Sequence, residues 1–121
     1  MIETYKFQNL TVYQLALDYI DQVYSSIAEL PDSERFNLSS QIRRAATSIA
    51  LNIAEGSTSQ SDPEQNRFLG LALRSYLETI SCLDLIERRA YLNPSQLNQL
   101  RRSGHQLFIK LIAFRNRLVS K

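Results

Sequence analysis

Apolar residues recur at three- and four-residue steps along four segments of the chain, and this spacing predicts four amphipathic helices. Short polar connections separate the segments, and Pro31 stops the first one because the residue before a proline avoids helical geometry. The predicted helices cover residues 11–29, 35–55, 62–91 and 94–119. We therefore expect an all-α fold, an up-down-up-down antiparallel four-helix bundle that forms a single domain over residues 1–121.

Capping residues mark the predicted helix ends. Ser61 is placed to cap the third helix, and Glu64 three residues later completes the pattern of a capping box. Asn93 precedes a proline and opens the fourth helix in the same way. At the other end of the second helix, Gly56 is expected to supply a left-handed closing residue.

Each predicted helix carries one apolar stripe that we assign to the core. The stripes are Tyr13, Ala16, Leu17, Ile20, Val23, Tyr24 and Ile27; Leu38, Ile42, Ala45, Ala46, Ile49 and Ile53; Leu69, Ala72, Tyr76, Ile80, Leu83 and Ile86; and Leu97, Leu100, Gly104, Leu107, Leu111, Phe114 and Leu118. The last stripe alternates strictly in steps of three and four, which is typical of helices packed nearly parallel or antiparallel.

The fourth segment carries further apolar residues outside its stripe, namely Phe108, Ile109 and Ile112. A second apolar face must be buried somewhere. Either the core stripe is wide at this point, or these residues form an interface between copies of the chain. The sequence leaves both interpretations open.

A line of polar residues runs beside the apolar stripe of the second segment, and a shorter one lies on the third. Their members are Arg44, Ser48, Asn52 and Glu55, and Ser75 and Glu78. Polar groups next to a core need partners. We favour a structural polar network that sets helix register, with Arg44 paired to Glu78, over a ligand or RNA site. An enzymatic site built from Arg44, Asn52, Glu55 and Glu78 is the weakest alternative, since acidic pairs are common on helical surfaces.

Charge is unevenly distributed along the chain. Residues 1–60 hold four basic and seven acidic side chains, whereas residues 61–121 hold ten basic and five acidic ones. From residue 88 onward no acid occurs, and the cations there are Arg88, Arg89, Arg101, Arg102, Lys110, Arg115, Arg117 and Lys121. An acid-free block of this kind points to an anionic partner. We predict that these eight residues bind nucleic acid through its phosphates, with Tyr91 available for stacking on a base.

Several kinds of chemistry have no support in the sequence. The chain has one histidine, His105, and one cysteine, Cys82, so it cannot form a Cys/His metal site, and it has no Gly-rich phosphate loop or nucleophile motif. We expect no enzymatic activity, no cofactor and no metal. The single cysteine, the lack of a signal peptide and the absence of a long apolar stretch lead us to expect a cytoplasmic protein without membrane contact.

The stretch Gln41-Ile42-Arg43-Arg44-Ala45-Ala46-Thr47-Ser48-Ile49-Ala50-Leu51-Asn52-Ile53-Ala54-Glu55-Gly56 resembles the four-helix-bundle proteins encoded in intervening sequences of bacterial 23S rRNA genes. The opening Phe7-Gln8-Asn9-Leu10-Thr11-Val12-Tyr13-Gln14 and the segment Ser75-Tyr76-Leu77-Glu78 are similar to the same family. The resemblance implies a bundle assembled as a ring-like homopentamer. A related branch is similar to the accessory variability proteins of diversity-generating retroelements, which implies a reverse transcriptase and its RNA as partners.

Together these features predict a homo-oligomeric helical bundle that binds RNA, single-stranded nucleic acid or an RNA-handling protein such as a retroelement reverse transcriptase. The alternative is a structural or protein-interaction module that does not contact nucleic acid.

Overall fold

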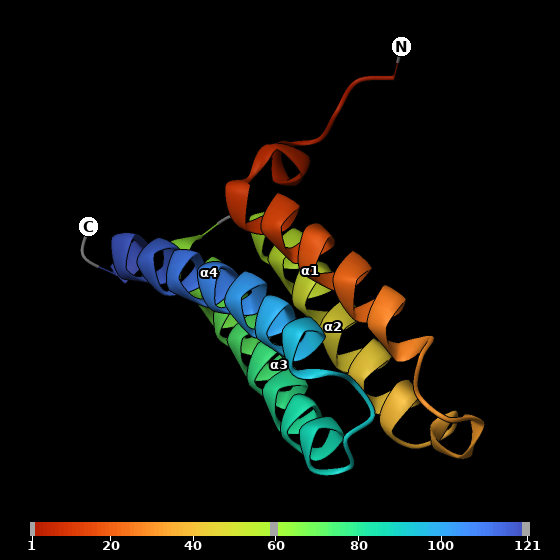
Figure 1. Ribbon diagram of the computed structural model, residues 1–121. Coiled ribbons are helices and arrows are strands. Elements are labelled where there is room, and N and C mark those ends of the chain that lie inside the picture. Colours follow the sequence, from red (N-terminus) through yellow and green to blue (C-terminus); the bar gives the residue numbers. More distant parts are fainter. Residues whose placement is uncertain (1, 59–60, 120–121) are drawn as a thin grey trace.

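The computed structural model describes residues 2–58 and 61–119 and contains four α-helices with two short 3-10 helices (Figure 1). In chain order these are η1 (Lys6–Asn9), α1 (Thr11–Ile27), η2 (Asp32–Glu34), α2 (Leu38–Ser57), α3 (Asp62–Arg88) and α4 (Pro94–Val119). No strand occurs in these two described ranges, so the predicted all-helical class is confirmed.

The four α-helices surround one apolar core. Helix α2 packs against α1 and α3, and α4 packs against α3 and α1, so neighbours in the chain are also neighbours in space (Figure 1). The α2–α3 contact is the most extensive of the four. The short helix η1 lies against α1 and α2.

The predicted caps hold at both proline-containing starts, with one difference. Ser61 accepts a hydrogen bond from the backbone N–H of Glu64 (3.3 Å), but the Glu64 carboxylate pairs with Arg67 at 2.7 Å instead of reaching back. At α4, Asn93 Oδ1 accepts from the backbone of Gln96 (2.8 Å), and the Gln96 side chain accepts from the backbone of Asn93 (3.1 Å). The second start is therefore a complete capping box.

The role predicted for Gly56 is wrong. Helix α2 continues through it to Ser57, and no glycine has a positive φ. Gly56 is instead a point of close approach, because a Cβ added there would lie 2.8 Å from Cβ of Phe68 on α3. The left-handed residue is Ala90, with φ 56°, which closes α3 three residues before its predicted end.

The core stripes agree with the sequence on α2 and differ on α1. All six predicted α2 residues are buried. On α1 the buried residues are Val12, Ala16, Tyr19, Val23 and Ile27. The predicted stripe was centred too far round the helix, since it left out Tyr19 and included Tyr24, which is exposed. A tyrosine that hydrogen-bonds inside the core has no distinctive signal in the spacing of apolar residues.

Tyr19 lies at the centre of the core in a chain of hydrogen bonds. Its hydroxyl lies 2.8 Å from Oγ1 of Thr79, and Thr79 in turn donates to the backbone oxygen of Tyr76 (2.5 Å). Both Tyr19 and Thr79 are fully buried, and burial raises the pKa of Tyr19 to about 12. Since each polar group has a partner, this chain joins α1 to α3 without leaving an unsatisfied group.

Gly104 of α4 faces the same two tyrosine rings. A Cβ at this position would lie 2.8 Å from the Tyr76 ring and 2.9 Å from the Tyr19 ring. The two rings have centroids 5.8 Å apart and are held by the surrounding core. Helix α4 can approach α1 and α3 this closely only because residue 104 has no side chain.

We predict that Gly104→Ala lowers the free energy of unfolding by about 1–3 kcal/mol, the usual cost of forcing an extra carbon into a packed core. Urea denaturation followed by circular dichroism measures this change.

Gly70→Ala is the matched control, because the nearest atoms to a Cβ at Gly70 belong to the flexible guanidinium of Arg115, at 3.4 Å. There the gain in helix propensity should leave stability unchanged or raise it by up to about 1 kcal/mol. If both variants behave alike, the crossing at Gly104 is not tight.

Candidate nucleic-acid interface

Arg101 belongs to the predicted binding set, but it is engaged within the protein. Its guanidinium donates to Glu87 (2.8 Å) and to Asp84 (3.1 Å), both on α3. Partial burial acts to lower the pKa of Arg101, but the two carboxylates raise it further than burial lowers it. The sequence from residue 88 onward contains no acidic residue. In the folded protein, however, α3 places the carboxylates of Asp84 and Glu87 beside it.

Arg115 also has a partner inside the bundle. Its Nε donates to Oδ1 of Asn66 at 2.8 Å, and its guanidinium lies over Gly70. The side chain is half-buried between α4 and α3. Arg115 therefore contributes to the packing of these helices as well as to the surface charge.

Three other cations of α4 are exposed: Arg102, Lys110 and Arg117. None of them forms an ion pair with another described residue. At 100° per residue they lie within about 80° of one another on the helix, spaced about 10–12 Å along its axis. The guanidinium of Arg117 lies over the Phe114 ring, 5.6 Å from its centroid. We call Arg102, Lys110 and Arg117 the basic stripe.

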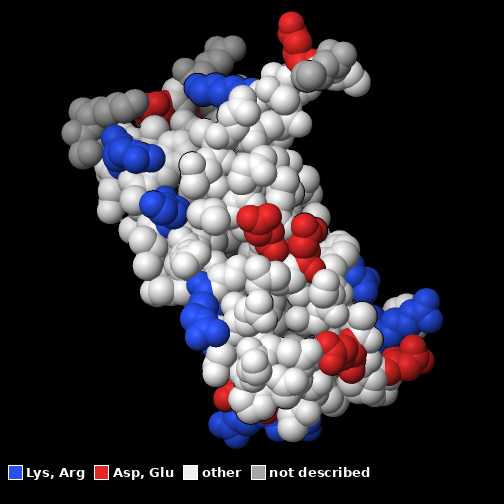
Figure 2. Space-filling view, turned by 45° about the horizontal axis from the view of Figure 1, so that its top comes forward, with Lys and Arg blue, Asp and Glu red and all other residues white. Residues whose placement is uncertain are grey.

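The remaining predicted cations are not part of this stripe. Arg88 and Arg89 are exposed at the end of α3, where the chain turns into α4, and Lys121 lies outside the described residues. Figure 2 shows basic and acidic side chains distributed over one face of the molecule between broad uncharged areas. A single subunit thus presents separated groups of cations.

Tyr91, considered above for base stacking, has a structural partner. Its hydroxyl donates to Oε2 of Glu34 at 2.8 Å and ties the α3–α4 connection to η2. This hydrogen bond lowers the pKa of Glu34 and raises that of Tyr91. Glu34 also accepts from the side chain of Asn37 (3.1 Å) at the start of α2.

The predicted polar network forms in part. Ser75 donates to Oγ of Ser48 (2.9 Å), and the Asn52 side chain donates to Oγ and the backbone oxygen of Ser48 (3.0 and 2.9 Å). These short side chains link α2 to α3 where the helices are close.

The charged members of that predicted network lie outside it. Arg44, Glu55 and Glu78 are exposed, and Arg44 donates to Gln41 (3.5 Å). No ion pair joins Arg44 to Glu78 among the described residues, so the structure does not support that pairing. The polar line that the sequence showed on each helix continues onto the solvent-facing side, where its charges need no partner.

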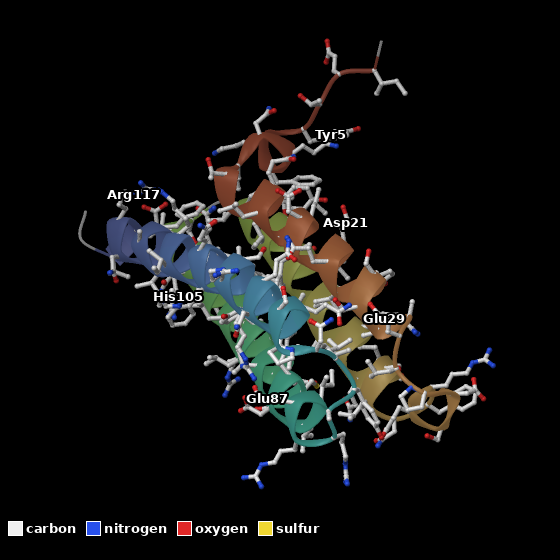
Figure 3. All side chains as sticks on the ribbon, in the orientation of Figure 1. Tyr5, Asp21, Glu29, Glu87, His105 and Arg117 are labelled. Carbon is white, nitrogen blue, oxygen red and sulfur yellow. The ribbon has the colours of Figure 1, made fainter. Side chains whose placement is uncertain are left out.

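A shallow hollow of about 360 Å³, wide open to solvent, lies between α3 and α4. Its lining residues are Tyr76, Leu77, Ile80, Arg101, His105 and Phe108. Phe108 forms part of the wall, with its ring centroid 5.5 Å from that of Tyr76 and 6.2 Å from that of His105. We call this hollow the α3–α4 groove; Figure 3 labels His105 midway along α4.

The three apolar residues outside the α4 stripe therefore separate into two groups. Phe108 is half-buried and packs against the core, as a wide stripe requires. Ile109 and Ile112 remain 51% and 36% exposed and have no such role. Together with Leu77 on α3, also 51% exposed, they extend the apolar surface around the groove.

No group of three or more His, Cys, Asp or Glu side chains in residues 2–58 and 61–119 lies close enough to hold a metal ion. Across the same ranges, no helix combines the length and apolarity needed to cross a membrane. Cys82 is buried in the core, and its burial raises the pKa of the thiol.

The chain matches known proteins over most of its length. Residues 8–113 match the model of the 23S rRNA-intervening sequence protein family. The structure is similar to a crystal structure from Bacteroides thetaiotaomicron, described as a protein of unknown function from the S23 ribosomal protein family. The TM-score is 0.78 at 26% identity, covering 87% of this chain and 98% of the other. Among curated proteins, none matches.

We predict that the Arg101–Glu87 pair is energetically coupled and that Arg44 and Glu78 are not. In double-mutant cycles, Arg101 and Glu87 should show a coupling of about 0.5–1 kcal/mol, as expected for a partly exposed ion pair. Arg44 and Glu78 should be additive within about 0.3–0.5 kcal/mol, because they are not paired. Urea denaturation of the single and double Gln variants gives both values, and strong coupling between Arg44 and Glu78 would contradict the structure.

Proposed function

Because the chain belongs to the 23S rRNA-intervening sequence protein family, we propose that it is a non-enzymatic cytoplasmic bundle that assembles with copies of itself and binds RNA. The observation that carries this proposal is the basic stripe on α4. Its three cations are exposed and unpaired among the described residues, on a helix whose described part has no acid. Such side chains are available for phosphates.

Assembly would strengthen the contact. One subunit offers only three spaced cations in the stripe, and so few phosphate contacts give a low affinity for RNA. In the proposed ring-like homopentamer of up-down-up-down bundles, each stripe is repeated by symmetry. Repeated stripes that engage one RNA strand gain affinity without any new type of contact. The exposed Ile109 and Ile112 support self-association, since apolar surface of this kind marks interaction sites.

The partner is RNA in the first instance. The spacing of about 10–12 Å between stripe residues suits contacts to the backbone more than to base edges, so we expect little sequence preference. A second partner would be an RNA-handling protein, such as the reverse transcriptase of a diversity-generating retroelement. The basic stripe and the RNA bound to it would recruit this protein together.

One observation favours the alternative of an interaction module without nucleic-acid contact. Arg101 and Arg115 both have partners within the bundle, so fewer of its cations are free for phosphates than the sequence suggests. The two functions differ in their response to salt, because only the nucleic-acid contact releases counterions.

We predict that the wild-type protein forms a homo-oligomer and that Ile109→Asp or Ile112→Asp dissociates it, because an unpaired carboxylate in an apolar interface is strongly unfavourable. Multi-angle light scattering gives the mass. Thr11→Asp, which adds the same charge at an exposed position in the first turn of α1, should leave the oligomer intact. A wild-type mass of 13.9 kDa at all concentrations would contradict self-association.

We predict that single-stranded RNA binds at about 50 mM salt and dissociates as salt rises, with a slope of about −0.7 per phosphate neutralised. Replacing Arg102, Lys110 and Arg117 by Gln should make the slope shallower by about 2 for each subunit in contact, as measured by filter binding.

The triple variant of Arg43, Arg44 and Arg74 to Gln removes the same charge from exposed positions on α2 and α3 that lie outside the predicted binding set, and it serves as the control. If the two triple variants lose binding equally, the stripe has no special role. If the wild-type protein retains no RNA at all, the alternative function is correct.

A further inference from the structure

Phe36 is the most exposed aromatic side chain among the described residues, at 88%. It lies in the connection between α1 and α2, and the guanidinium of Arg35 rests 5.2 Å from its ring centroid. An isolated exposed residue needs no explanation. A whole phenyl ring exposed on a hydrogen-bonded connection is different, because burying it in a partner would remove about 150–250 Å² from water.

The connection that carries Phe36 is held in shape by hydrogen bonds on both sides. The backbone N–H of Glu34 donates to Pro31 (2.9 Å), and that of Asn37 donates to Glu34 (3.0 Å). The Glu34 carboxylate accepts from Tyr91 and Asn37, as described above. The ring is thus presented by a preorganised backbone, which reduces the entropy lost when a partner binds it.

The α3–α4 groove is complementary to this ring. Its walls are aromatic and aliphatic, with Tyr76, Phe108 and Leu77 among them, and its volume of about 360 Å³ is large enough for a phenyl side chain. Aromatic pairs prefer the tilted and edge-on arrangements that such walls allow.

The charges around the two sites also match. Arg35 flanks Phe36, while the groove is lined by Arg101, whose guanidinium is outnumbered by its two partners Asp84 and Glu87, which keep 66% and 60% of their side chains exposed. If the Phe36 ring entered the groove, the neighbouring guanidinium of Arg35 would move towards the carboxylates of Asp84 and Glu87. An unpaired base of an RNA would instead bring a phosphate towards them, which is unfavourable.

Phe36 cannot reach the α3–α4 groove of its own subunit. The α1–α2 connection lies at one end of the α1–α2 pair, at the lower right of Figure 1, whereas α3 and α4 lie on the other side of the core. In Figure 3, His105 lies on that other side, in the middle of α4. The ring and the groove must therefore be contributed by different subunits.

We propose that Phe36 of one subunit docks into the α3–α4 groove of the next, so that this surface takes a second copy of the chain as its partner. This inference rests on the proposed self-association and specifies its geometry. A contact between two different surfaces is heterologous, and it closes into a ring when the rotation between subunits allows it. Ile109 and Ile112 then surround the buried ring and exclude water from it.

Two variants with complementary defects test the contact. Phe36→Ala removes the ring, and Leu77→Asp places a carboxylate in the groove of an otherwise intact subunit. Both positions are exposed, so thermal unfolding should stay close to that of the wild type. Each variant alone should assemble at least ~30-fold more weakly, as expected for the loss of a hot-spot residue. Leu51→Asp, at a position 64% exposed on α2, is the control and should assemble normally.

Mixing the two defective variants is the decisive step. Each mixed pair retains one intact contact, formed by the ring of the Leu77→Asp subunit and the groove of the Phe36→Ala subunit. The mixture should therefore yield 1:1 heterodimers and nothing larger, as seen by native mass spectrometry.

The other outcomes overturn the proposal in distinguishable ways. If the wild type assembles and Phe36→Ala assembles equally well, the ring is not part of the interface and the proposed function is unaffected. If both variants dissociate but their mixture gives no heterodimer, the ring and the groove do not contact each other. A wild-type protein that remains monomeric overturns self-association itself, and this contact with it.

Discussion

The approach of α4 to the centre of the bundle depends on the hydrogen atom that Gly104 carries instead of a side chain. The Tyr19 and Tyr76 rings occupy the space where a Cβ would lie, 2.9 and 2.8 Å away. The rings in turn are fixed by the hydrogen bonds from Tyr19 to Thr79 and from Thr79 to the Tyr76 backbone. One small residue thus sets how α4 meets α1 and α3 together.

The surfaces that we connect with function follow from this crossing. Tyr76 is covered by Gly104 on one side and by Phe108 on another, so the same ring supports the core and forms the base of the α3–α4 groove. With the stripe of Leu97, Leu100, Leu107 and Leu111 buried, α4 has two further sides. One faces the groove and presents His105 and Phe108, and the other presents the basic stripe. Self-association and RNA contact would therefore use neighbouring sides of one helix, with Ile109 at their border about 20° from Arg102.

The sequence predicted the helices well and their charged contacts poorly, for physical reasons. Periodicity reports which side of a helix is apolar, so the α2 stripe and the start of α4 were predicted correctly. It cannot report what a neighbouring helix brings, and for this reason the pairing of Arg101 with α3 carboxylates and the separation of Arg44 from Glu78 were missed. Gly56 shows the same limit. Glycine serves both as a helix end and as a close contact, and only the position of Phe68 distinguishes them.

We have proposed that this chain acts as an assembly of identical bundles whose repeated basic stripes bind RNA. Native mass spectrometry of the protein with a single-stranded RNA tests both parts in one spectrum. We expect a complex containing several 13.9 kDa subunits and one RNA, with the RNA lost before the subunits separate as salt is raised. A spectrum that contains only 13.9 kDa subunits and free RNA at low salt would contradict it.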